Sequence, residues 1–157
     1  MRGPRSRVLT QPRITSTRNQ QDEPMLSPAA KASRGFVALN ALLFIGLGLR
    51  ALSEPAAHMA PFDLIAPSAA MLGEIRANYG GMHLAMGVLF LFGAWLEQWR
   101  RPALLLIAAF CGGLVLGRLV SIFAEGWPNP FVTQLLVVEM VATAIAVALL
   151  VADRKMA

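Results

Sequence analysis

The sequence is poor in the side chains from which catalytic and metal sites are usually built. Of its 157 residues, only 15% are charged, two are histidine and one is cysteine. A single cysteine, Cys111, excludes a disulfide framework within the chain and a CxxC redox or metal motif. No HExxH, GxSxG or P-loop pattern occurs. Zinc-peptidase, serine-hydrolase and P-loop nucleotide chemistry therefore have no support in the sequence.

The two histidines are also badly placed to hold a cofactor. We expect His58 in a loop and His83 in a helix, so they cannot form an axial pair for a haem between two helices. A metal bound by His83 and Glu139 would need a third ligand that the sequence does not offer. We therefore expect no metal, no cofactor and no catalytic residue, and an enzyme that uses His83 as an acid or base is a third hypothesis behind the two given below.

Nucleic-acid binding is not expected, despite a net charge of +5. The basic residues concentrate in the N-terminal tail and at the ends of apolar runs. A nucleic-acid surface would show a basic stripe with interleaved aromatic residues, and none is present.

What the sequence has in abundance is apolar residues, at 56% of the chain. Four apolar runs occur, each near the ~20 residues that a helix needs to cross a bilayer. Stretches such as "ALLLIAAF" and "AIAVALLVA" are apolar all round, whereas a soluble bundle needs a polar stripe on each helix. Pro102 and Pro130 open the third and fourth runs, where a missing N–H does no harm. We expect an all-α four-helix transmembrane bundle, with helices at about 35–53, 75–97, 102–124 and 130–152.

The first 34 residues differ in composition and are expected to be disordered. They are rich in Arg, Pro, Ser, Thr and Gln, and they lack the apolar core and cleavage site of a signal peptide. A true start at Met25 would remove five arginines and two acids, which lowers the net charge from +5 to +2. The basic character of the chain is then largely a property of its tail.

The charges that flank the runs predict the orientation. Three ends are basic, and they carry Lys31 and Arg34, Arg100 and Arg101, and Arg154 and Lys155. The other two links are acidic, with Glu54 and Asp63 in one and Glu125 in the other. By the positive-inside rule both termini are cytoplasmic, in a multi-pass protein of the inner (plasma) membrane. The long outer link, residues 53–73, is expected to pack over the outer mouth of the bundle, because structureless loops of this length are unusual.

Ionisable residues inside the runs are predicted to share one layer. At 1.5 Å per residue, His83, Arg118 and Glu139 all fall about 8–13 Å below the outer surface. Because a charge that faces lipid costs at least about 2.5–3.5 kcal/mol, we expect these side chains to face each other. Glu139 is the natural partner of Arg118 by depth, with Glu125 and Glu74 as competitors nearer the surface.

Helical spacing extends this layer to a candidate pocket. Residues 76, 79, 80, 83 and 87 fall on one face of the second run, and residues 111, 114, 118, 121 and 125 on one face of the third. The candidate ligand-binding or buried polar residues are Arg76, Tyr79, His83, Arg118, Ser121 and Glu139. An equally plain interpretation is a structural Arg118–Glu139 pair that fixes helix register.

Small residues recur at four-residue spacing and predict close helix packing. One ridge runs through residues 77, 81 and 85, and another through residues 109, 113 and 117. The candidate packing glycines are Gly80, Gly81, Gly87, Gly113 and Gly117.

The stretches "EIRANYGGMHLAMG" and "GRLVSIFAEGWPNP", followed by a late glutamate, resemble a small bacterial membrane family known as domain of unknown function 4345. The resemblance covers about residues 32–151 and implies four membrane helices without an established activity. The family residues that it implies are Arg76, Tyr79, Gly80, Gly81, Gly87, Gly117, Arg118, Ser121, Gly126, Pro128 and Glu139. The architecture is also distantly similar to DoxX-type proteins, which says little about function.

Two functional hypotheses follow. The first is a protein that binds or helps transport a small polar or amphipathic molecule in the outer half of the membrane, with Arg118 as an anion anchor and Glu139 as its counter-charge. The second is a structural or assembly subunit of a larger membrane complex, in which the buried Arg–Glu pair sets helix packing. The expected partners are the lipid bilayer and either another membrane protein or further copies of the chain.

Overall fold

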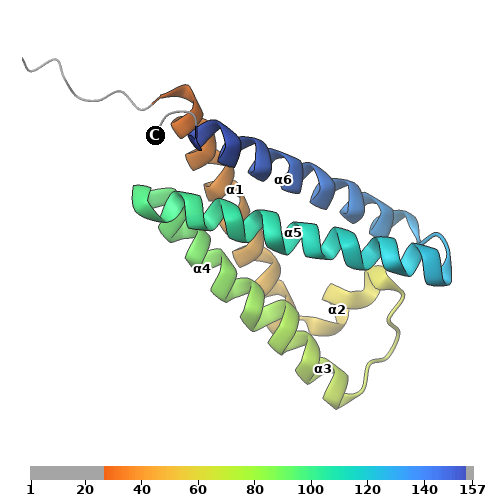
Figure 1. Cartoon of the computed structure of the whole chain (residues 1–157). Coiled ribbons are helices and arrows are strands. Elements are labelled where there is room, and N and C mark those ends of the chain that lie inside the picture. The colour runs from red at the N-terminus through yellow and green to blue at the C-terminus, as the bar shows by residue number, and fades with distance from the viewer. Residues whose placement is uncertain (1–26, 155–157) are drawn as a thin grey trace, which may run out of the picture.

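The computed structural model describes residues 27–154, and side chains up to residue 152. All regular structure among these residues is helical, so the predicted all-α class is confirmed. The elements in chain order are α1 (Pro28–Ser53), α2 (Pro55–Met59), the short 3₁₀ helix η1 (Ala60–Phe62), α3 (Ala69–Ile75), the π-helix η2 (Arg76–Gly81), α4 (Met82–Trp95), α5 (Glu97–Glu125) and α6 (Pro130–Arg154). Figure 1 shows how they are arranged.

Three helices are long and apolar enough to cross a membrane by length and composition: α1, α5 and the stretch Pro130–Ala152 of α6. Many large apolar side chains on α5 and α6 point outward, including Leu116 at 65% and Phe123 at 88% exposure. Apolar side chains on all sides of a long helix are typical of helices whose outer surface meets lipid.

The helices form two closely packed pairs, α1 with α4 and α5 with α6. Figure 1 shows that α1 begins, α5 begins and α6 ends at one end of the molecule, while α2, α3 and the α5–α6 link lie at the other. From the first end to the second, α3 and α4 diverge from α5. Between the pairs, side chains from α1, α4, α5 and α6 build one core, which includes Val37, Phe90, Leu104 and Ala146.

Glycines allow α1 and α4 to approach closely. A Cβ on Gly48 of α1 would lie 2.8 Å from the Leu84 nitrogen, and one on Gly87 would lie 2.9 Å from the Ile45 nitrogen. A Cβ on Gly80 would meet the side chain of Leu52 at 2.7 Å. Gly80 and Gly87 were predicted to pack and do so, whereas Gly48 was missed.

The other predicted packing glycines make no such approach. A Cβ on Gly113 or Gly117 would meet nothing within 4 Å, and one on Gly81 would reach only the Arg76 carbonyl at 3.9 Å. Gly81, Gly113 and Gly117 therefore make no close helix contact within the chain. Small residues at four-residue spacing line up on a helix, but spacing does not say whether a neighbour faces them.

The helix boundaries differ from the predicted ones at three places. The second helical segment begins at Ala69, six residues early, because the Ser68 side chain accepts the N–H of Met71 and caps α3. A single extended residue, Leu96 (φ −99°, ψ 119°), separates α4 from α5. Pro102 therefore lies in the second turn of α5, where it removes one intrahelical hydrogen bond, and it does not open the helix.

At the far end of α5, the backbone takes a conformation that glycine alone adopts easily. Gly126 follows the helix with φ 96°, in the region that side chains with a Cβ rarely enter. At the start of α1, residues 28–34 are helical, so predicted disorder up to residue 34 is wrong there. The rest of the tail, including Met25, lies outside the described residues.

Candidate functional site

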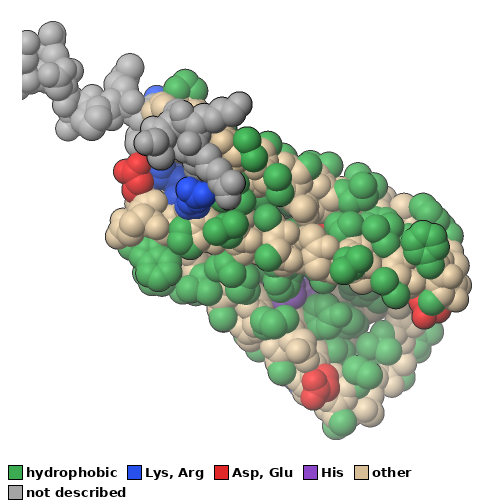
Figure 2. Space-filling view, in the orientation of Figure 1, with side chains coloured by type: hydrophobic (Ala, Val, Ile, Leu, Met, Phe, Trp, Pro, Cys, Tyr) green, Lys and Arg blue, Asp and Glu red, His purple; other side chains and the backbone are tan. Residues whose placement is uncertain are grey.

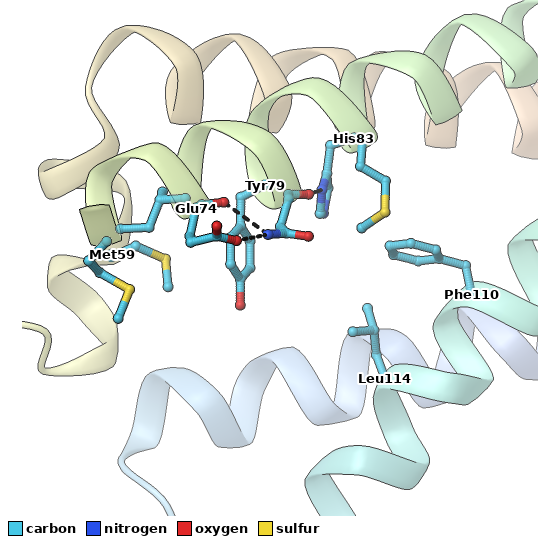
Figure 3. Close-up of a pocket in the computed structure, with 10 residues that line it drawn as sticks. Met59, Glu74, Tyr79, His83, Phe110 and Leu114 are labelled. Atoms are coloured by element: carbon cyan, nitrogen blue, oxygen red, sulfur yellow. Dashed lines mark hydrogen bonds between the residues drawn. The ribbon is translucent and has the colours of Figure 1, made fainter. Parts of the chain in front are cut away.

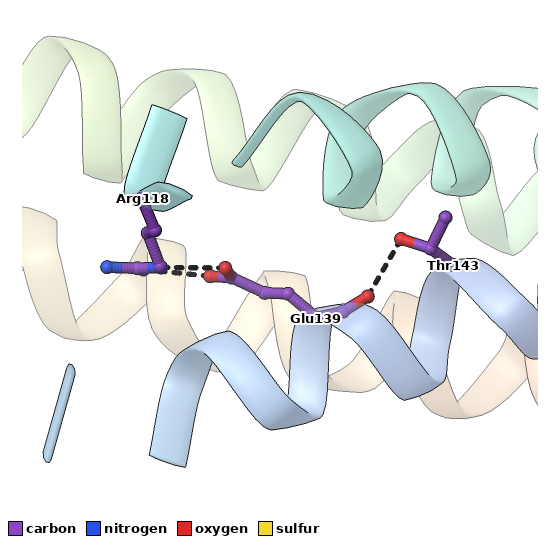
Figure 4. Close-up of polar contacts among 3 residues, drawn as sticks. All are labelled: Arg118, Glu139 and Thr143. Atoms are coloured by element: carbon purple, nitrogen blue, oxygen red, sulfur yellow. Dashed lines mark hydrogen bonds and ion pairs between the residues drawn. The ribbon is translucent and has the colours of Figure 1, made fainter. Parts of the chain in front are cut away.

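Arg118 of α5 and Glu139 of α6 form a two-pronged ion pair (Figure 4). Arg118 Nε donates to Glu139 Oε2 at 2.7 Å, and Nη2 donates to Oε1 at 2.8 Å. The two side chains keep only 20% and 11% exposure. Thr143, one turn further along α6, donates its hydroxyl to the Glu139 carbonyl at 2.7 Å. The predicted pairing is confirmed, and both carboxylate oxygens of Glu139 are occupied by Arg118.

His83 lies elsewhere, inside an aromatic cluster. Its ring stacks on Phe44 of α1 at 5.3 Å between centroids and on Tyr79 of η2 at 5.8 Å, with interplanar angles of 23° and 19°. The edge of Phe110 of α5 completes the enclosure at 5.6 Å and 88°. Phe110 precedes Arg118 by about 12 Å along α5, at 1.5 Å per residue. No hydrogen bond or ion pair joins His83 to Arg118 or Glu139 among the described residues, so the three side chains do not form one polar cluster.

A cleft of about 440 Å³ opens beside His83, between the α3–η2–α4 segment and α5. Its lining residues come from α2, α3, η2, α4 and α5 and are Met59, Met71, Glu74, Ile75, Asn78, Tyr79, Met82, His83, Phe110 and Leu114. Figure 3 shows His83 and Tyr79 projecting from one wall, with Phe110 and Leu114 on the other. In Figure 2, which has the orientation of Figure 1, histidine surface is visible in a hollow between α4 and α5. Because Leu114 lies one turn from Arg118, the cleft is next to the ion pair without including it.

The six predicted site residues therefore divide into separate groups. Tyr79 and His83 line the cleft, and Arg118 and Glu139 bind each other. Arg76 is exposed and donates from Nε to the Leu52 carbonyl at the end of α1, 3.2 Å away. Ser121 is exposed on α5 and is outside the cleft lining.

The predicted face of the second run is split between two neighbours, and it contains the π-helix η2. Within η2 the backbone hydrogen bonds span five residues, as in the bond from the Met82 N–H to the Ala77 carbonyl. Gly80 packs against α1 while its neighbour Tyr79 lines the cleft. Adjacent residues of an α-helix point about 100° apart, so the broad predicted face divides between two neighbours.

Several site residues could not be found from the sequence. Phe44, Met82 and Phe110 lie in apolar runs, where nothing separates them from ordinary core residues, and Met59 and Met71 lie in the outer link. The backbone carbonyl of Asn78 accepts a hydrogen bond from Nδ1 of His83, five residues later in the chain. Residues five apart are not neighbours on the surface of an α-helix, so this contact was not expected. The "NYGG" sequence, with two glycines in a helix, was the available signal for irregular backbone.

The outer link is tied to the start of α6. Asn129 donates to the Pro61 carbonyl at 3.1 Å and to Asp63 Oδ2 at 2.8 Å, while its Oδ1 accepts the N–H of Val132 and caps α6. Phe62 packs edge-on against Phe131 at 5.2 Å. Earlier in the link, burial lowers the pKa of His58, and the charge of Arg50 lowers it further.

The fold and the site thus define an all-helical protein with helices fit to span a membrane and a partly polar cleft between two helix pairs. The chain belongs to the family described as domain of unknown function DUF4345, whose model matches residues 32–150. None of the curated proteins and none of the solved structures matches it.

Proposed function

We propose that this is a multi-pass protein of the plasma (inner) membrane with four spans, both termini in the cytoplasm, and a binding cleft in the outer half of the bilayer. The fourth span is the continuous α3–η2–α4 segment, residues 69–95, which at 1.5 Å per residue is about 40 Å long. Basic side chains gather at the end where α5 begins, beside one acidic group, and other acidic side chains lie at the opposite end (Figure 2). That distribution supports the orientation.

The function that we propose is binding, or accessory transport, of a small amphipathic molecule in the cleft. The observation that carries the proposal is the cleft itself, whose volume of about 440 Å³ lies in the range of ligand sites, roughly 300–1,000 Å³. Its lining combines apolar side chains with Tyr79, His83 and Glu74. The proposal does not use Arg118 as an anchor, because Arg118 binds Glu139 and lies outside the cleft lining.

Filling the cleft tests this function. The substitution Leu114→Trp places a large side chain in the cleft, whereas Leu116→Trp, on the outer surface of the same helix, is the matched control. Native mass spectrometry after gentle purification should find a retained small molecule on the unaltered protein and on the control. Equal retention in Leu114→Trp, or none in any of the three proteins, would contradict the proposal.

The second candidate is a structural or assembly subunit, and the closed geometry of the Arg118–Glu139 pair favours it. A pair whose groups satisfy each other is well suited to fix the register of α5 on α6. In that case Arg118→Ala and Glu139→Gln should each lower the amount of inserted protein, and the charge-reversed double variant Arg118→Glu with Glu139→Arg should restore it. A binding role for the pair instead predicts normal levels with lost ligand.

A further inference from the structure

The hydrogen-bond inventory of the cleft indicates which ligand it can take. The His83 ring nitrogen Nδ1 lies 3.2 Å from the carbonyl oxygen of Asn78. A carbonyl oxygen accepts hydrogen bonds and cannot donate them, so Nδ1 must carry the proton. In a neutral imidazole the other nitrogen, Nε2, is then an acceptor.

The surroundings of His83 hold the ring in this arrangement. The ring stacks on Phe44 and on Tyr79, and Phe110 lies beside it in a T-shaped arrangement. The i to i+5 spacing of Asn78 and His83 matches the wide turns of the π-helix that lies between them. The irregular backbone of η2 thus fixes the tautomer of a side chain that lines the cleft.

The other polar side chains of the cleft also present acceptors. Asn78 directs Nδ2 to two oxygens of Glu74, the carbonyl at 3.1 Å and Oε2 at 3.0 Å (Figure 3). Its two amide hydrogens are therefore used, and its own Oδ1 remains an acceptor. The Glu74 carboxylate can only accept, while the Tyr79 hydroxyl can do either. Among the described residues that line the cleft, none is lysine or arginine.

From this surplus of acceptors we propose that the cleft selects a small apolar molecule with a hydrogen-bond-donating head group, and that Nε2 of His83 accepts that hydrogen bond. This inference rests on the proposed binding function and makes it specific. A carboxylate or phosphate would face acceptors, so the earlier expectation of an anionic ligand is replaced. The methionine and aromatic walls take the apolar body of the ligand.

A matched pair of probes tests the proposal. 4-Pentylphenol carries a donating hydroxyl, and 4-pentylanisole replaces that hydrogen with a methyl group. Each probe is added to the full-length protein in lipid nanodiscs at equal mole fractions in the lipid. Binding is read from the ¹³C-methyl signals of the methionines. Met59, Met71 and Met82 line the cleft, whereas Met140 is exposed on α6 and reports partitioning into lipid alone.

We expect the phenol to bind about five- to tenfold more tightly than the anisole, the effect of one net hydrogen bond. His83→Phe keeps an aromatic ring in the stack and should abolish the difference. His58→Phe removes the other histidine, which lies outside the cleft lining, and as the matched control it should keep the difference. In the unaltered protein, the phenol should also shift the ¹⁵Nε2 signal of His83 while the anisole does not, a measurement that needs no variant.

The outcomes separate the two levels of the proposal. Equal affinity for the two probes, or a preference that persists in His83→Phe, overturns the donor assignment and leaves a binding cleft. If neither probe shifts the cleft methyls more than Met140, the binding function fails and the donor assignment with it.

Discussion

Removing one member of the Arg118–Glu139 pair should destabilise the protein, and removing both should not. Each single change strands a charged group among side chains that leave only 20% of Arg118 and 11% of Glu139 exposed. Breaking a fully buried pair costs about 3–5 kcal/mol, whereas hydrogen bonds within membrane proteins couple by about 0.6–1.7 kcal/mol. With the remaining exposure, we expect each single change to lower the free energy of unfolding by about 2–3 kcal/mol.

The two single changes should differ in size. A stranded carboxylate can neutralise itself by taking up a proton, but a guanidinium cannot lose one. Glu139→Leu should therefore destabilise more than Arg118→Met. The double variant places two apolar side chains in contact and should lie within about 1 kcal/mol of the unaltered protein.

Reversible unfolding in detergent micelles, followed by helical circular dichroism, measures the four free energies of this double-mutant cycle. Val138→Ala is the control, because Val138 neighbours Glu139 but is exposed on the outer surface, and it should change stability by about 0.5 kcal/mol or less. If the effects of the two single changes simply add in the double variant, the pair does not act as a unit and the reasoning is wrong.

Two further predictions concern packing and the outer link. Gly48→Val should destabilise by about 1–3 kcal/mol, because its Cβ would press on the backbone of α4, whereas Gly46→Val, with open space around it, should change little beyond helix propensity; thermal unfolding of both variants measures this. Asn129→Ala should lower stability by about 1–2 kcal/mol, since it removes the α6 cap and the bond to Asp63. Asn129→Ser keeps an acceptor for the Val132 N–H without placing a second carboxylate beside Asp63, so recovery of most of the loss identifies the cap as the larger contribution, and no loss in either variant would refute it.

The sequence predicted the fold class and one pair of the site well. Long apolar runs separated by charged or proline-containing links leave the chain few alternatives to long apolar helices. Arg118 and Glu139 could be matched because charged groups inside such helices need partners, and depth along each helix follows from a constant rise per residue. Boundaries set by one residue, such as Leu96, carry no comparable signal.

The rest of the site was decided by tertiary structure. Whether a residue faces a neighbour depends on helix rotation, and it is the packing of the helices that places Tyr79 and His83 on the cleft and Gly80 against α1. The aromatic enclosure of His83 combines side chains from α1, η2 and α5, which are far apart in the chain. Their meeting depends on how the helix pairs diverge, a property of packing that no local pattern encodes.

The sequence by itself therefore determined that this chain forms apolar helices and that its two deepest opposite charges pair, because burial in an apolar surrounding permits little else. Only the tertiary structure decided that the pair is closed and that the open site lies two turns away around His83. The physical reason is that two buried opposite charges need only each other as partners, and their positions along the helices can be calculated from the sequence. A cleft exists only where two packed helices move apart, and that depends on the packing of the whole bundle.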